Sequence, residues 1–141
     1  IIYMNQTNKN EFNSILWKLG QETEDAILPS INNKWEANFK RKQDIFDIID
    51  FHDVDKRIAC EVKGRRNKSS AYPSTIITLN KTHEAYRLID EGWQVYYVFV
   101  FTDKTMYCKL TGEENWEVKL TGSFQIEHNL IPISELKEID E

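Results

Sequence analysis

The chain carries a carboxylate and a lysine two residues apart within residues 58–68, which read IACEVKGRRNK. Side chains alternate along a strand, so Glu61 and Lys63 would point to the same face of this otherwise apolar segment. A glycine and a cluster of positive charges follow directly. This combination favours either an ordinary charge pair on an exposed edge strand or one half of a catalytic site.

An aspartate on the preceding segment can complete such a site. The segments DIFDIIDF and KRIACEVKG flank a polar HDVDK, a pattern that predicts a β-hairpin. If its turn centres on Val54, Asp47 lies directly opposite Glu61, with the two Cβ atoms roughly 4.5–5.5 Å apart. A slip of one residue would present Asp50 instead, because a slip exchanges the faces of a strand. We favour Asp47 and keep Asp50 as the alternative.

Two opposed carboxylates repel each other, and a divalent cation turns this repulsion into attraction. We therefore expect a site for Mg²⁺ (or Mn²⁺) made by Asp47, Glu61 and the carbonyl oxygen of Val62. Lys63 beside it would stabilise a developing negative charge or lower the pKa of an attacking water. These parts predict hydrolysis of a phosphodiester, and the sequence offers no Ser/His or Cys/His arrangement that competes for the role.

Positive charge is concentrated around this motif. The net charge of the chain is −5, but residues 34–81 hold eleven Lys or Arg against seven Asp or Glu. Such asymmetry permits a phosphate-binding surface on an acidic protein. The candidate nucleic-acid contacts are Arg65, Arg66 and Lys68, which follow the motif, and Lys81, at the start of a predicted helix where backbone amides favour anions.

The elements that must position these residues follow from the spacing of apolar residues. Residues 11–28 have the three-and-four spacing of an amphipathic helix, which we expect to end at PSINNK. The hairpin, a strand at TIITL, a helix from Asn80 or Thr82 to about Asp90 and a buried strand at WQVYYVFVF follow. Strands at MYCKL and WEVKL and a short helix at SELKEI complete the chain. The order α-β-β-β-α-β-β predicts an α/β (α+β) fold with a single mixed β-sheet and helices on its faces.

The bulk properties fit one domain that spans residues 1–141. No apolar run approaches the roughly 18–20 residues of a membrane helix, and no secretory signal is present. Cys60 and Cys108 lie in strand-like segments without metal-site spacing, so we expect buried free thiols and a cytoplasmic protein. The chain begins at Ile1 rather than at a methionine, which indicates a trimmed chain or a fragment.

The pattern resembles the PD-(D/E)XK nuclease superfamily, which has the restriction-endonuclease-like fold. The matching segments are FDIIDF, CEVKGR and LGQETEDAIL, and the order of elements from residue 11 to residue 110 is similar to that family's core, α-β-β-β-α-β. The chain is similar to small phage-type and Holliday-junction-resolvase-type members. The proline that gives the family its name is absent, because Phe46 precedes Asp47.

The resemblance implies that Asp47 and Glu61 bind the metal and that Lys63 is the catalytic lysine. It also implies a glutamate from the first helix. Glu24 has the family's G-x-x-x-E spacing from Gly20, and Glu22 is the alternative.

We therefore expect a metal-dependent DNA nuclease, more an endonuclease than an exonuclease, with structure-selective or low sequence specificity. RNA as substrate, a homodimer and a phage origin are compatible with the sequence. Two other readings stay open. One is an inactive nucleic-acid-binding domain of the same fold, and the other is a glycosidase with a carboxylate pair, against which Lys63 and the positive loop argue.

Overall fold

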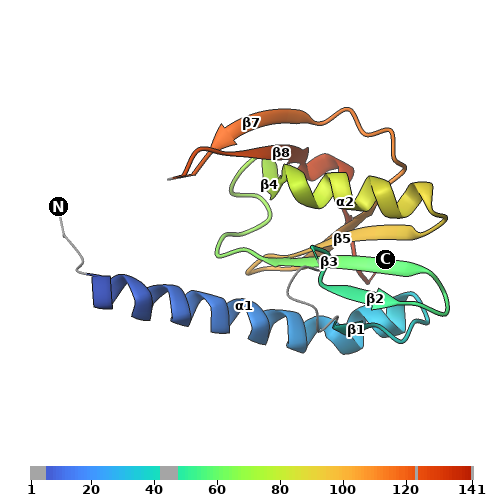
Figure 1. The fold of residues 1–141 in the computed structure, drawn as a ribbon, viewed down its shortest axis with the longest axis horizontal. Coiled ribbons are helices and arrows are strands. Elements are labelled where there is room, and N and C mark those ends of the chain that lie inside the picture. The colour runs from blue at the N-terminus through green and yellow to red at the C-terminus, as the bar shows by residue number, and fades with distance from the viewer. Residues whose placement is uncertain (1–5, 42–47, 123, 141) are drawn as a thin grey trace.

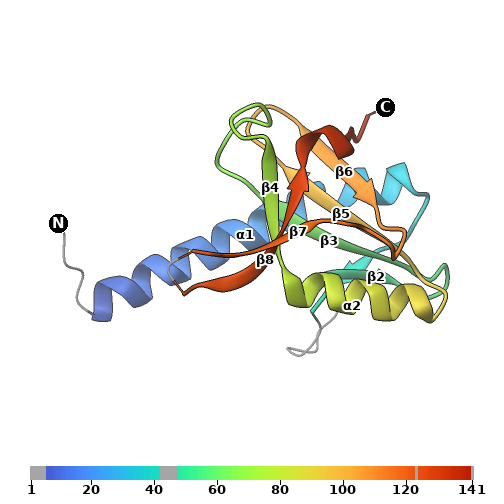
Figure 2. The ribbon, with the colours of Figure 1, turned by 90° about the horizontal axis from the view of Figure 1, so that it is seen from above.

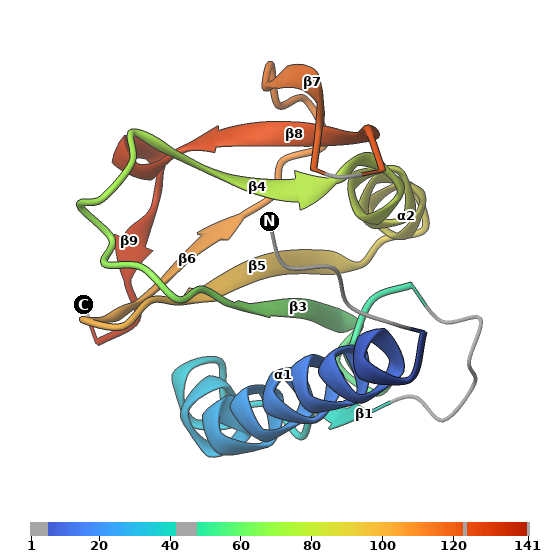
Figure 3. The same ribbon diagram turned by 90° about the vertical axis from the view of Figure 1, so that its left-hand side faces the viewer.

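The computed structural model describes residues 6–41, 48–122 and 124–140, with side chains from Ser14 onward. The elements form three layers, which Figure 1 and Figure 3 show from two sides. Helix α1 covers one face of a central sheet, and helix α2 and a second, smaller sheet cover the other face. Asp47, one of the predicted site residues, lies outside the described residues.

The central sheet has six strands in the order β1-β2-β3-β5-β6-β9. Strands β3 and β5 pair in parallel, and the other neighbours are antiparallel. Burial on both faces explains the almost unbroken apolar sequence of β5. The strands are β1 (Lys40–Arg41), β2 (Phe51–Asp53), β3 (Ile58–Gly64), β5 (Gln94–Val100), β6 (Thr105–Lys109) and β9 (Lys137–Glu138).

The mixed sheet between helices confirms the predicted fold class, but the prediction of a single sheet was incomplete. Three strands form a second sheet in the order β4-β8-β7. These strands are β4 (Ser74–Thr78), β7 (Glu117–Thr121) and β8 (Ile126–Pro132), and β8 was not predicted. The helix expected at SELKEI is a 3-10 turn, Ile133–Glu135, followed by β9, because pairing with β6 holds the chain extended there.

Helix α1 spans Gln6–Lys34 and is longer than predicted. It continues through Pro29 instead of ending there, because Ile31, which is 0% exposed, packs against the central sheet on the next turn. The N-terminal half of α1 projects beyond the sheet (Figure 1). Ile15 and Leu19, which belong to the apolar spacing of residues 11–28, are therefore 58% and 46% exposed.

Helix α2 spans Leu79–Asp90 and ends as predicted, before Gly92, which takes a φ of +92°, but it starts before the predicted caps, since Thr78 is the N-cap residue. It starts directly after β4 and lies on the face of β3 and β5 opposite α1, as Figure 2 and Figure 3 show. Tyr96 and Phe99 of β5 are buried as predicted, and Trp93 is partly buried against the same core. No helix in the described ranges is both long and apolar enough to cross a bilayer.

The hairpin between β2 and β3 has a different register from the predicted one. Phe51 pairs with Cys60 and Asp53 pairs with Ile58, so the turn comprises residues 54–57 and does not centre on Val54. Asp53 fixes this turn because its carboxylate accepts the backbone N–H of Lys56 at 3.1 Å. Arg57 then takes a positive φ of 54° and returns the chain to β3.

Candidate active site

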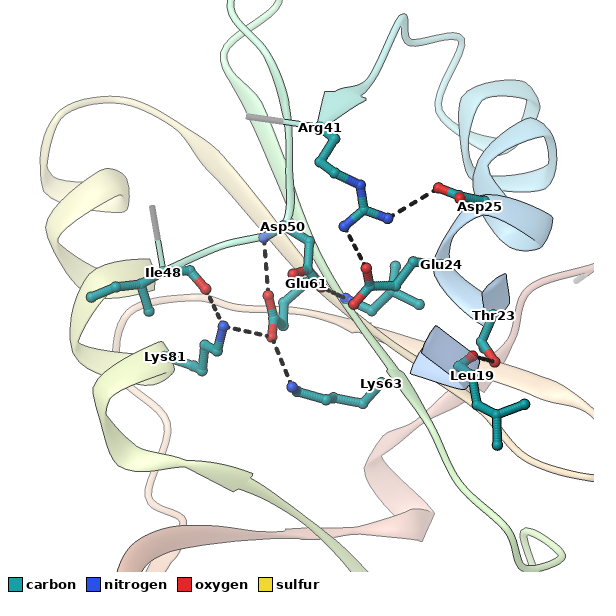
Figure 4. Close-up of polar contacts among 11 residues, drawn as sticks. Leu19, Thr23, Glu24, Asp25, Arg41, Ile48, Asp50, Glu61, Lys63 and Lys81 are labelled. Atoms are coloured by element: carbon teal, nitrogen blue, oxygen red, sulfur yellow. Dashed lines mark hydrogen bonds and ion pairs between the residues drawn. The ribbon is translucent and has the colours of Figure 1, made fainter. Parts of the chain in front are cut away.

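Glu61 lies at the centre of the candidate site, on β3, where it pairs with Tyr97 of β5 and is 0% exposed. Its Oε1 atom accepts the backbone N–H of Asp50 at 3.0 Å. Its Oε2 atom faces the ammonium groups of Lys81 at 3.1 Å and Lys63 at 3.5 Å (Figure 4). Oε2 is therefore a buried oxygen that two ion pairs hold, without a hydrogen bond of good geometry among the described residues.

Asp50 is the aspartate that the observed register brings beside Glu61. Its Oδ2 atom accepts the backbone N–H of Val62 at 3.1 Å, which directs the carboxylate along β3 (Figure 4). Burial, with the charge of Asp50 as the next cause, raises the pKa of Glu61 to about 8, although Lys81 and Lys63 act in the opposite direction. A buried carboxylate with a pKa this high needs additional positive charge nearby, such as a cation, to be ionised at neutral pH.

Two lysines from different elements supply positive charge here. Lys63 extends from β3, and its side chain is about one-third exposed. Lys81 extends from the first turn of α2, is more deeply buried, and also donates to the backbone carbonyl of Ile48. We predicted a nucleic-acid contact for Lys81. In the structure its ammonium group lies against Glu61 and compensates the buried charge, and the contact with nucleic acid stays a prediction.

Glu24 approaches the same region from α1. Its Oε2 atom accepts from Arg41 Nη1 at 2.5 Å, and a second nitrogen of Arg41 binds Asp25 at 3.0 Å. Burial and the charge of Asp50 raise the pKa of Glu24. Glu22, the alternative helix carboxylate, is exposed and does not border the site.

Beside these carboxylates is a cleft of about 550 Å³ between α1 and the end of β3. The close approach of the two elements depends on Gly64, since a Cβ atom there would lie 3.2 Å from Thr23 Cγ2. The residues that line the cleft are Leu16, Leu19, Gly20, Thr23, Glu24, Val62, Lys63, Gly64, Arg65, Arg66, Val100 and Phe101.

The three basic residues after β3 differ in their surroundings. Arg65 turns inward, where its Nε atom donates to Thr75 Oγ1 at 3.1 Å and another nitrogen donates to the carbonyl of Ile76. Burial lowers the pKa of Arg65, whose main structural effect is to join β3 to β4. Arg66 and Lys68 are exposed, and no carboxylate in the described ranges pairs with either.

The donor set fits a hard divalent cation. Asp50 and Glu61 provide two carboxylates, and Oε2 of Glu61 is a buried oxygen that lacks a hydrogen bond. No cluster of three or more His, Cys, Asp or Glu side chains suited to a metal occurs within the described ranges. Mg²⁺ does not require such a cluster, because it is commonly held by one or two carboxylates with water and substrate phosphate.

Sequence reasoning ranked Asp50 second and missed Arg41. The pairing of Arg41 with Glu24 joins residues 17 positions apart on two elements, and no motif marks it. The sequence did contain a signal for the register that places Asp50 beside Glu61. Aspartates frequently start turns because their side chains accept a backbone N–H shortly after them in the chain. Asp53 makes this contact with Lys56, and the register of the hairpin follows from it.

A comparison with family models finds a match over residues 18–125 to a family described as "Phage putative PDDEXK endonuclease". The matched segment includes Glu24, Asp50, Glu61, Lys63 and Lys81. No curated protein matches the chain, and no solved structure does.

Proposed function

The chain belongs to this phage PDDEXK endonuclease family, and we propose that it hydrolyses phosphodiester bonds of DNA with a divalent cation held by Asp50 and Glu61. The observation that carries the proposal is the buried Oε2 atom of Glu61. This oxygen is 0% exposed with its residue, lies near the second carboxylate, Asp50, and pairs with the ammonium groups of Lys81 and Lys63. A glutamate that only fills the core would not be expected in such surroundings, because burial of a carboxylate costs free energy even when lysines pair with it.

Asp50 takes the place that the sequence prediction gave to Asp47. The support is the observed register, in which Asp50 exchanges contacts with Glu61 and Val62. Asp47 lies outside the described residues, so its assignment as a ligand stays a prediction. The carbonyl oxygen of Val62, between Glu61 and Lys63, is kept as a further proposed ligand.

When bound, the cation would act as a Lewis acid on the phosphate and would favour the hydroxide form of a bound water. The residues of the chain have complementary roles. The backbone N–H of Val62 orients Asp50, and the N–H of Asp50 orients Glu61. Lys63, at the border of the cleft, holds a positive charge where negative charge develops on the phosphate. Lys81 and Ile48 fix the position of the second ammonium group.

Glu24 is proposed as the helix carboxylate of the site. It borders the cleft, but in the structure Arg41 binds one of its oxygens. Its carboxyl group also lies close enough to Asp50 for the charge of Asp50 to raise the pKa of Glu24. Arg66 and Lys68, which are exposed beside the cleft, are proposed to bind backbone phosphates without reading sequence. A structure-selective endonuclease suits residues 48–122 and 124–140, where the described elements all belong to the two sheets, α2 and the turns between them and none is set apart for reading bases in the major groove.

A nuclease assay tests the proposal. Linear duplex, single-stranded, flapped and four-way-junction DNA and an RNA strand would be incubated with Mg²⁺ or Mn²⁺, with EDTA as one control. Lys63→Ala should abolish cleavage, whereas Lys119→Ala, the same change on exposed strand β7, should not. Cleavage that persists in EDTA or in folded Lys63→Ala protein would overturn the proposed mechanism. Binding of DNA without cleavage by the wild-type protein would favour the inactive binding domain.

A further inference from the structure

The two walls of the cleft differ in chemistry. On the side of α1, Leu16, Leu19 and Gly20 form an apolar part of the lining, called here the apolar wall, and Thr23 and Glu24 continue this side. On the opposite side, called the cationic wall, Lys63 and Arg66 border the cleft beside apolar residues of β3 and β5. The α1 side therefore offers apolar surface and a carboxylate but no cation, and the cations lie on the opposite side.

The apolar wall exists because α1 is longer than the sheet it covers. Leu16 and Leu19 lie on the N-terminal half of α1, which passes beyond the sheet. Outside the helix's own backbone, no heavy atom lies within 4 Å of the position that a Cβ atom on Gly20 would take. The wall is thus open at Gly20, where Leu16 is half-buried and Leu19 is exposed.

The cationic wall is available for phosphate. Arg66 and, next in the same loop, Lys68 are exposed, and the structure gives neither an ion pair with a carboxylate in the described ranges. Arg65, whose guanidinium bonds to Thr75 and Ile76, holds the start of this loop against β4. The position of the basic residues relative to α1 is therefore fixed by protein contacts on the cationic side.

A duplex and a single strand would meet these walls differently. A B-form duplex carries a phosphate backbone on both of its edges, so one backbone would face the leucines, which provide no charge to neutralise it. An extended single strand has phosphates on one side and exposed bases on the other. Proteins that bind single strands combine a basic track for the backbone with apolar or aromatic surface for the bases.

We propose that the cleft binds a single-stranded segment of nucleic acid, with phosphates toward Lys63 and Arg66 and bases against Leu16 and Leu19. The proposal rests on the proposed nuclease function, for which it specifies the substrate: the strand that enters the site is unpaired, as in a flap, a frayed end or a displaced strand.

The test is a binding measurement in EDTA, which removes the cation and prevents cleavage. Fluorescence anisotropy would compare a labelled thymidine oligomer with a labelled blunt duplex of the same length. The wild-type protein should bind the single strand about fivefold or more tightly than the duplex. Leu19→Lys should reduce this preference about fivefold, because it adds a phosphate partner to the apolar wall and removes a base contact.

Ile15→Lys is the matched control. Ile15 is exposed on the same helix but does not border the cleft, so the variant adds the same charge without changing either wall. Equal effects of Ile15→Lys and Leu19→Lys, or a wild-type preference for duplex, would overturn the proposal. A single-strand preference that only Leu19→Lys reduces supports it.

The nuclease assay separates this proposal from the function on which it rests. Single-strand binding that responds to Leu19→Lys, together with no cleavage in Mg²⁺ or Mn²⁺, would leave the cleft assignment in place and reject the catalytic function. Metal-dependent cleavage of duplex by a protein that binds duplex preferentially would support the catalytic function and reject the single-strand assignment of the cleft.

Discussion

Asp50→Asn distinguishes the observed register from the predicted one most directly. The amide oxygen of asparagine can still accept the N–H of Val62, which Asp50 accepts at 3.1 Å. We therefore expect the free energy of unfolding of the metal-free variant to lie within about 1 kcal/mol of the wild-type value. Asp50→Ala, in contrast, leaves the N–H of Val62 without this acceptor and should cost about 1–3 kcal/mol.

The response to metal should change much more than the metal-free stability. A cation at about 100 times its Kd stabilises the folded state by roughly 2.7 kcal/mol, provided that it does not bind the unfolded chain. For a chain of 141 residues this corresponds to a rise in Tm on the order of 10 °C. Asp50→Asn should lose most of this rise, because the site then retains one carboxylate ligand, and cleavage should fall by about 100-fold or more.

Differential scanning fluorimetry with and without Mg²⁺ or Mn²⁺ measures both quantities. Asp47→Asn is the matched control, since the sequence prediction places the ligand at Asp47. The expected result is a lost metal response in Asp50→Asn and a retained one in Asp47→Asn. A retained response in Asp50→Asn with a lost response in Asp47→Asn would refute the assignment based on the observed register.

Three other perturbations test the site and its supports. The pKa of Glu61 is raised to about 8, so the folded protein keeps a proton that the unfolded chain releases near the ordinary pKa of glutamate. The free energy of unfolding without metal should therefore fall as pH rises from about 5 to 8. This fall should be absent in Glu61→Gln, as chemical denaturation at several pH values would measure. Gly20→Ala should raise the free energy of unfolding by about 0.5–1 kcal/mol, because its Cβ meets open space, whereas Gly64→Ala should show no such gain because Thr23 is in the way; chemical denaturation measures both. Arg65→Ala should destabilise the fold by about 1–3 kcal/mol, and Arg65→Lys should not restore it, because lysine cannot reproduce the two separate hydrogen bonds; equal stability of Arg65→Lys and the wild type in the same assay would contradict this.

The parts of the fold that depend on local pattern could be predicted from the sequence. The alternation in IACEVKG predicted that Glu61 and Lys63 share a face, and Nζ of Lys63 lies 3.5 Å from Oε2 of Glu61. The apolar run of β5 and the spacing in α2 predicted a buried strand and a helix, and both are present, but the parallel pairing of β5 with β3 was not predicted. These elements are determined by residues within one segment, so a single sequence contains the information.

The parts that depend on contacts between distant segments could not be predicted in the same way. The hairpin register depends on which residue starts the turn, and the carboxylate of Asp53 decides this by bonding to Lys56 and to Asn38. The end of α1 depends on tertiary packing of Ile31, which outweighs the tendency of Pro29 to interrupt a helix. The pairing of β4 with β8 likewise joins residues 50 to 58 positions apart.

The parallel pairing of β3 and β5 has a consequence for how the protein reaches its native state. Each residue of β3 pairs with a residue 36 positions later, so the chain must close a long loop before these contacts form. Topologies rich in such distant contacts fold slowly. During that delay the segment QVYYVFV, which combines strong β propensity with no charge, is exposed to other chains. The yield of soluble protein should therefore fall with rising temperature and expression rate, even for variants whose equilibrium stability equals that of the wild type.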